Sequence, residues 1–208
     1  MSLDHTPFVF LVSAPSGAGK TTLLTSLLAA DAGLRYSVSY TTRPAREGEV
    51  DGRDYYFVTD AMFRDLVGSG VMLESAYVHG HYYGTSVSVV RDVLASGFDV
   101  VLDVDVEGFG NVQSVSLDVV SVFILPPSMS ELRRRLVSRG TETVKDLDIR
   151  LRAARKEIEW ASRYDYIVVN DQVDTAVKKM ESILSAERLK SGRVGSVVEK
   201  IKLDGLGS

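Results

Sequence analysis

Cysteine is absent from this 208-residue chain, which excludes a disulfide framework, a thiolate nucleophile and a zinc–sulfur site. Because disulfides belong to oxidising compartments, this composition favours a cytoplasmic location. Long apolar runs are missing too, since no segment approaches the roughly 18 apolar residues that a membrane helix needs. The N-terminal stretch MSLDHTPFVFLVS lacks the basic residues that open a secretory signal. We therefore expect a soluble protein with no membrane partner.

Positive charge is not in excess, because the formal net charge is -4. That balance argues against a nucleic-acid partner bound across the surface. The three histidines show no metal-ligand spacing, and we expect them at the surface. With 45% hydrophobic and 25% charged residues, the composition is that of an ordinary globular protein. Monomer and homo-oligomer both stay open, since periodicity does not separate an interface from a core.

Four short apolar runs have the β-branched, nearly continuous pattern of strands buried on both faces. They span residues 8–13, 99–105, 119–125 and 165–169. Helical patterns follow the first and the last run, with apolar residues along one stripe. Strands that alternate with helices predict an α/β fold with a parallel sheet.

Two regions interrupt this alternation. The first reads as short alternating strands and turns, which predicts a small, mostly β insertion. The second reads as charged helices with little apolar surface of their own, which predicts a mobile lid. The tail beyond the last helix is expected to be loosely held. The predicted divisions are a core of residues 1–35, 91–127 and 161–190, an insertion of 36–90, a lid of 128–160 and a C-terminal extension of 191–208.

The stretch SAPSGAGKTT, residues 13–22, ends the first predicted strand and opens a helix. Its backbone N–H groups can surround an anion, and Gly17 and Gly19 permit positive φ. Lys20 can reach the β- and γ-phosphates of a nucleotide, and the Thr21 hydroxyl can bind Mg²⁺. The usual pattern G-x-x-x-x-G-K-[ST] departs only at its first glycine, which is alanine here; the alternative is an ordinary strand–turn–helix with a solvated lysine. The predicted ATP-phosphate cradle comprises Ala14, Pro15, Ser16, Gly17, Ala18, Gly19, Lys20, Thr21 and Thr22.

Asp103 closes a predicted strand, where a carboxylate can face Mg²⁺ and its waters, although such an aspartate alone is an ordinary turn former. In the insertion, Arg43 and Arg46 stand three apart across a proline. Two guanidinium forks on a stiff loop suit an anion, phosphate above all. Tyr55 and Tyr83 can each add a phenolic donor. The alternative for this stretch is a solvated charged loop.

These blocks together resemble the guanylate kinases. The similarity runs from about residue 8 to residue 190, through SAPSGAGKTT, SYTTRPAREGEVDGRDYYFV, HYYGTS, LDVDVEG, ILPPS, RLVSRGTET and VVND. It implies a P-loop kinase with a parallel five-stranded sheet, a β-rich GMP-binding insertion and a helical lid. It also implies phosphoryl transfer from ATP to GMP, and to dGMP as a further acceptor, with Mg²⁺ as cofactor.

The resemblance further implies roles for individual residues. A carboxylate such as Glu74 can accept from both N1–H and N2–H of guanine, whereas adenine lacks these donors. Taken alone, Glu74 reads as an exposed strand carboxylate. The residues implied to hold GMP are Ser39, Arg43, Arg46, Tyr55, Glu74, Tyr83, Thr85, Asp103 and Asp105.

The predicted lid carries arginines that, by the same resemblance, close over the transferring phosphoryl group. Arg135 and Arg139 lie one helical turn apart, and Arg150 follows on the next helix. With Lys20 and Arg43 they form the implied catalytic set. Asn170 matches a position near the adenine of ATP, although it also reads as a turn residue. Thr21 and Asp103 are the implied metal ligands.

Two alternatives stand beside this interpretation. One is a kinase for another nucleoside monophosphate, such as AMP or a pyrimidine nucleotide. The other is a guanylate-kinase-like protein-binding module without catalysis. Because the chain keeps Lys20, Thr21 and Asp103, it favours the enzyme over the module.

Overall fold

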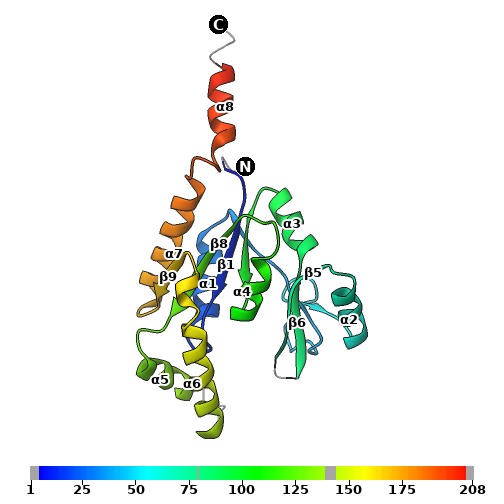
Figure 1. Ribbon diagram of the computed structural model, residues 1–208, viewed down its shortest axis with the longest axis vertical. Helices are drawn as coiled ribbons and strands as arrows, with labels where there is room; N and C mark the ends of the chain where they lie inside the picture. Colours follow the sequence, from blue (N-terminus) through cyan, green and yellow to red (C-terminus); the bar gives the residue numbers. More distant parts are fainter. Residues whose placement is uncertain (1–4, 79, 139–143, 205–208) are drawn as a thin grey trace.

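The computed structural model describes residues 5–78, 80–138 and 144–204, and its centre is a parallel five-stranded sheet (Figure 1). The strand order is β2-β7-β1-β8-β9. This architecture confirms the predicted α/β class and all four predicted strands. The strands are β1 (Val9–Ser13), β2 (Leu34–Tyr36), β7 (Asp99–Asp103), β8 (Val119–Leu125) and β9 (Tyr166–Val169).

Alternate residues of β1 enter two separate apolar layers, as the period of a strand requires. Phe10 and Val12 pack with α1 (Lys20–Ala30) and α7 (Val173–Arg188). Val9 and Leu11 pack on the other side, where the covering helices are α3 (Val87–Ala95), α4 (Val106–Val112) and the 3₁₀ helix η1 (Ala161–Arg163). All five residues of β1 are buried. Because both faces of the sheet are covered, its central strands read as continuous apolar runs.

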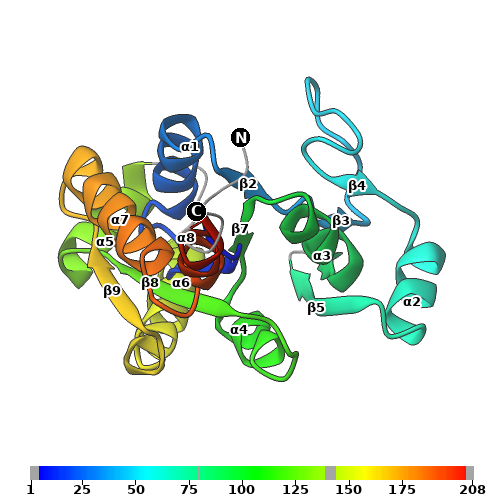
Figure 2. The ribbon, with the colours of Figure 1, turned by 90° about the horizontal axis from the view of Figure 1, so that it is seen from above.

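A second sheet lies to one side of the first (Figure 2). Its order is β4-β3-β6-β5, with β3 (Tyr40–Thr41), β4 (Tyr56–Phe57), β5 (Met72–Val78) and β6 (His81–Ser86). This region also contains a helix, α2 (Asp60–Gly68), which the alternating pattern does not predict. Thr59 caps that helix by accepting a hydrogen bond from the Met62 amide. The β5–β6 hairpin supplies several of the predicted site residues.

The charged segment predicted as a lid forms α5 (Met129–Ser138) and α6 (Val144–Ile158). Its sequence suggested little apolar surface, but Leu132, Leu136, Leu147 and Ala154 are buried together. Leu132 and Leu136 are four apart, so they share one face of α5. That face packs against the loop after β1, and the segment is therefore anchored by apolar contacts as well as by charge.

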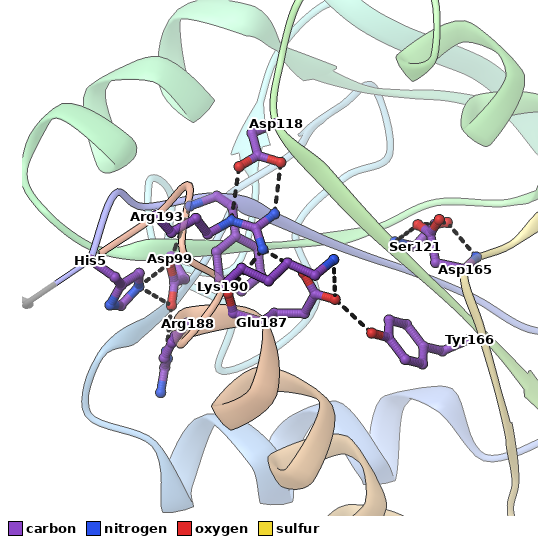
Figure 3. Close-up of polar contacts among 11 residues, drawn as sticks. His5, Asp99, Asp118, Ser121, Asp165, Tyr166, Glu187, Arg188, Lys190 and Arg193 are labelled. Atoms are coloured by element: carbon purple, nitrogen blue, oxygen red, sulfur yellow. Dashed lines mark hydrogen bonds and ion pairs between the residues drawn. The ribbon is translucent and has the colours of Figure 1, made fainter. Parts of the chain in front are cut away.

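The amino-terminal edge of the large sheet is tied together by buried ion pairs (Figure 3). Asp99, which begins β7, is fully buried and accepts hydrogen bonds from the Phe8 amide at 3.1 Å and Arg188 Nε at 2.7 Å. His5 Nε2 lies 3.0 Å from the same carboxylate. The expectation of surface histidines is wrong for His5, which is 8% exposed, because a buried carboxylate gives it a partner. His79 lies outside the described residues.

Arg193 holds the start of the C-terminal extension against the core. Its guanidinium bonds to Asp118 at 2.7 and 2.9 Å and also pairs with Glu187. Its carbonyl accepts a 2.8 Å hydrogen bond from the Thr6 amide. The extension is therefore firmly held at its start, and α8 (Gly195–Asp204) projects beyond it (Figure 1). Within the described ranges, no helix combines the length and apolar character needed to cross a bilayer.

Candidate active site

The loop after β1 has the backbone of an anion cradle. Gly17 and Gly19 adopt φ values of 90° and 95°, which an L-residue takes only with strain. The Ala18 amide donates to the Pro15 carbonyl at 3.0 Å, which closes the turn before α1 begins at Lys20. Both threonines that follow are exposed on the first turn of α1, and no acidic residue lies there. The helix end is therefore free to attract a phosphate.

The glycines also make room for protein on the inner side of the loop. A Cβ on Gly17 would lie 2.8 Å from Leu136 Cδ2, and one on Gly19 would collide with the Asn170 amide. That amide donates to the Ala18 carbonyl at 2.8 Å. Tight packing as well as anion access thus requires glycine at both positions.

Arg135 braces the same loop from α5. Its Nη1 donates to the Ala18 carbonyl at 3.3 Å and its Nη2 to the Asn170 carbonyl at 3.0 Å. Its Nε bonds to Glu131 at 2.8 Å. Arg135 thus lies beside the cradle. Arg150 is partly exposed on α6, and Arg139 lies outside the described residues.

Lys20 connects the cradle to the end of β7. Its ammonium pairs with Asp103 and donates to the Val104 carbonyl at 3.3 Å. Both charged side chains keep about a fifth of their surface exposed, at 20% and 21%. The lysine of the cradle and the carboxylate at the end of β7 thus form an ion pair with each other.

A cavity of about 230 Å³ opens beside this ion pair. It joins the end of the large sheet to the second sheet, so it brings together residues far apart in sequence. Six of the predicted GMP-site residues line it, together with Lys20. The lining comprises Lys20, Tyr36, Ser39, Tyr55, Glu74, Ala76, Tyr83, Gly84, Asp103, Val104 and Asp105.

Glu74 lines this cavity from β5. It pairs with Thr85 across the β5–β6 hairpin, and Thr85 Oγ1 lies 3.1 Å from Ser39 Oγ. Burial, together with the nearby charge of Asp105, raises the pKa of Glu74 to about 7, although hydrogen bonding to Thr85 opposes the rise. A strongly shifted carboxyl in a cavity is typical of a functional site. Glu74 is thus poised to titrate near neutral pH.

Arg43 lies above Tyr55, with its Cζ 5.4 Å from the ring centroid. Tyr55 and Tyr83 meet edge to face with ring centroids 6.0 Å apart. Arg46 is exposed on the same loop. A carboxylate that the sequence reasoning missed, Glu49, holds the Arg43 guanidinium at 2.8 and 3.0 Å. The sequence signal for Glu49 was its position three residues after Arg46, within a turn.

Two further residues escaped the sequence reasoning. Tyr36 lines the cavity from the end of β2, and burial raises its pKa. Glu157, in the last turn of α6, has an oxygen that is buried without a hydrogen-bond partner among the described residues. Burial raises the pKa of Glu157, while a hydrogen bond from the Ser16 amide opposes that rise. Neither residue belongs to a local motif, because each is placed by tertiary packing.

The fold and the site together define a class of protein. The loop that carries Lys20 follows β1, the central strand of a parallel sheet. The second sheet contributes Glu74 to the cavity, and α5 of the helical segment packs on the cradle. These are the parts of a P-loop nucleoside monophosphate kinase.

Comparison with known proteins identifies the family. The family model of guanylate kinase matches residues 6–187, and the chain belongs to the guanylate kinase family. A guanylate kinase of Nitrosomonas europaea is 47% identical over 185 residues, covering 89% of this chain and 92% of the relative. One from Methylobacillus flagellatus is 43% identical, covering 93% and 98%.

A solved structure agrees with this membership. The crystal structure of guanylate kinase from Anaplasma phagocytophilum superposes with a TM-score of 0.70 and 34% sequence identity. The match covers 90% of this chain and 89% of that one. The sheet and its flanking helices therefore have the arrangement found in a solved guanylate kinase.

Proposed function

We propose that the chain transfers the γ-phosphoryl group of ATP to GMP, producing ADP and GDP, and that dGMP is a further acceptor. The observation that carries this proposal is the cavity that joins Lys20 of the cradle to Glu74 of the second sheet. It offers an ammonium for the donor phosphates at one end and a carboxylate for a purine edge at the other.

The guanine is recognised at the end of the cavity that Glu74 lines. Ionised Glu74 accepts hydrogen bonds from N1–H and N2–H, while Ser39 and Thr85 present hydroxyls beside it. Asp105 completes this end of the lining. Adenine would leave the half-buried carboxylate unpaired, and sites built on such pairing can discriminate by about 10⁴ or more.

The phosphate of GMP is held by Arg43, Arg46, Tyr55 and Tyr83. The two tyrosines line the cavity, and Arg43 stacks on the first of them. Positive charge and phenolic donors together suit a phosphate dianion. We propose that the acceptor oxygen then lies between the guanine site and Lys20.

The phosphates of ATP are held by the cradle amides from Ala14 to Thr22 and by Lys20. To reach them, Lys20 exchanges its bonds to Asp103 and Val104 for a phosphate oxygen. Arg135 steadies the cradle, and we assign Arg139 and Arg150 to charge stabilisation. Asn170 stays a predicted adenine contact, although its amide is buried beneath the loop.

The chemistry follows from position and charge. A phosphate oxygen of GMP attacks the γ-phosphorus in line, the bond to the β–γ bridging oxygen breaks, and ADP leaves. No strong base is required, because the GMP phosphate is already anionic at neutral pH. Lys20, Arg43 and the lid arginines stabilise the charge that spreads over the transferring group. We propose residues 36–90 as the acceptor-binding part and 128–160 as the lid that excludes water.

Magnesium fits the donors present. Thr21 offers an exposed hydroxyl and Asp103 a carboxylate, both hard oxygen ligands of the kind Mg²⁺ prefers. Within the described ranges, no cluster of three His, Cys, Asp or Glu residues could form a protein cage for a metal. That matches an ion held mainly by substrate phosphates and water. Bound there, Mg²⁺ would neutralise phosphate charge in the transition state.

The experiment is a coupled assay of ADP formation with GMP, dGMP, AMP, UMP and CMP as acceptors. We expect GMP to give by far the highest kcat/KM. A preference for AMP would overturn the role of Glu74, and no turnover with any acceptor would favour a binding module. We propose the cytoplasm as the compartment of this reaction.

A further inference from the structure

Arg43, the proposed ligand of the GMP phosphate, is already engaged in this structure by Glu49. Its Nη1 donates to Glu49 Oε2 at 3.0 Å and to the Pro44 carbonyl at 2.8 Å. Its Nη2 donates to Glu49 Oε1 at 2.8 Å. The carboxylate thus takes the outer, end-on fork of the guanidinium in a bidentate pair.

This arrangement leaves one edge of the guanidinium for another anion. A guanidinium has five N–H groups, and three are used by Glu49 and Pro44. The remaining two, on Nε and Nη2, point in the same direction and form a second, side-on fork. In the described part of the chain, no carboxylate bonds to that fork.

Arg43 contacts both of the tyrosines that line the cavity. The pKa of Arg43 is raised first by the hydrogen bond to Glu49 and further by one with Tyr83, although burial acts against both. Tyr83 lines the cavity, as does Tyr55, on which the guanidinium stacks. A phosphate bound at these tyrosines would therefore lie beside Arg43 and can accept from the N–H groups that Glu49 and Pro44 leave.

Glu49 is itself fixed. Its Oε2 accepts a 2.7 Å hydrogen bond from the Arg46 amide, and the Glu49 amide donates back to the Arg46 carbonyl at 3.1 Å. The Arg43 amide is held in turn by Thr41 Oγ1 at 3.1 Å. The Glu49 carboxylate is thus held in a fixed position by the hydrogen bonds of a closed turn.

We propose that Glu49 is a positioning residue for phosphate recognition, which clamps one fork of Arg43 so that the other is presented to the acceptor phosphate. This inference rests on the proposed function, because it requires GMP at the cavity. If Glu49 instead occupied the phosphate site and had to be displaced by GMP, its substitution would strengthen GMP binding.

The test compares Glu49→Gln with Glu47→Gln, a matched control on the same loop for which no contact with Arg43 is found. Gln keeps the shape of the side chain but loses the bidentate pair. Steady-state kinetics give KM for GMP, KM for ATP and kcat, and calorimetry gives dissociation constants for GMP and for guanosine. The same substitutions are repeated in an Arg43→Ala background.

We expect Glu49→Gln to raise KM and Kd for GMP about tenfold, while the ATP and guanosine constants stay within about twofold. Glu49→Asp should fall between wild type and Glu49→Gln. In the Arg43→Ala background the Glu49 effect should vanish. Thermal unfolding midpoints verify that each variant is folded.

Three results would overturn the inference: unchanged GMP affinity in Glu49→Gln, tighter GMP binding, or an equal loss when Arg43 is absent. A wild-type enzyme that does not respond to GMP would overturn the proposed function and, with it, this inference. A GMP-dependent wild type with an unaffected Glu49→Gln variant would overturn the inference alone.

Discussion

Guanine binding should depend on pH through Glu74. The carboxyl must be ionised to accept two hydrogen bonds from guanine, yet burial and Asp105 raise its pKa to about 7. One pH unit below that value, only about a tenth of the sites are ionised. We therefore expect the dissociation constant to rise about tenfold per pH unit below 7 and to level off above about pH 8. Binding near pH 6 should release close to one proton.

Guanosine is the ligand for this measurement, because the phosphate of GMP has its own pKa near 6. Calorimetry in buffers of different ionisation enthalpy, from pH 6 to 8, reports affinity and released protons together. Glu74→Gln should bind weakly and lose the pH dependence, whereas the control Glu107→Gln, exposed on α4, should keep it. A flat wild-type profile, or the same slope in Glu74→Gln, would refute the role given to this carboxyl.

The same shift predicts how stability responds. The folded-state pKa of Glu74 lies above its ordinary value of 4.5, so the folded protein holds this proton more tightly than the unfolded chain. The stabilisation from Glu74 is complete below about pH 4.5 and is lost as pH rises through 7. The change of the free energy of unfolding with pH, measured by urea denaturation, should therefore differ between wild type and Glu74→Gln from about pH 4.5 to 7.

Three further variants probe the cradle and the opposite edge of the sheet. Lys20→Ala should lower kcat by about 10²–10³ in the coupled assay, with an unchanged circular dichroism spectrum, and near-normal turnover would remove Lys20 from catalysis. Gly19→Ala should destabilise the protein by about 1–2 kcal/mol in urea denaturation, because its φ is 95° and its Cβ meets Asn170; no loss would contradict that packing. Asp99→Asn should cost about 3 kcal/mol while kcat stays within about twofold, since the buried carboxylate lies far from the cradle; a matching loss of activity would refute this separation.

The parts predictable from sequence are those encoded locally. The four predicted strands are continuous apolar runs, and the cradle is a contiguous motif between a strand and a helix. β2 escaped because it is short and only Leu34 is fully buried in it. α2 escaped because the alternating pattern around it suggested strands. Local rules therefore recover the strands that are apolar runs, the edge strand β9 among them, but not the short edge strand β2.

Features created by distant packing could not be predicted. The burial of His5 depends on Asp99, which is 94 residues away. The contact of Leu136 with the cradle glycine joins α5 to a loop more than a hundred residues earlier. Glu49 can be read in the sequence, but its bidentate pairing with Arg43 depends on how the turn closes. The partners of His5 and of the cradle glycine are specified by the fold as a whole, because no short window of sequence contains both members.

The hydrogen bond between Thr6 and Arg193 means that both ends of the folded core meet at one point. A short linker from residue 194 to residue 5 can therefore join them, and new ends can be opened at Gly70, an exposed turn with open space around it. In such a circular permutant the strand order of the large sheet is unchanged. The polypeptide then starts and stops beside the second sheet, and a fluorophore can be attached there.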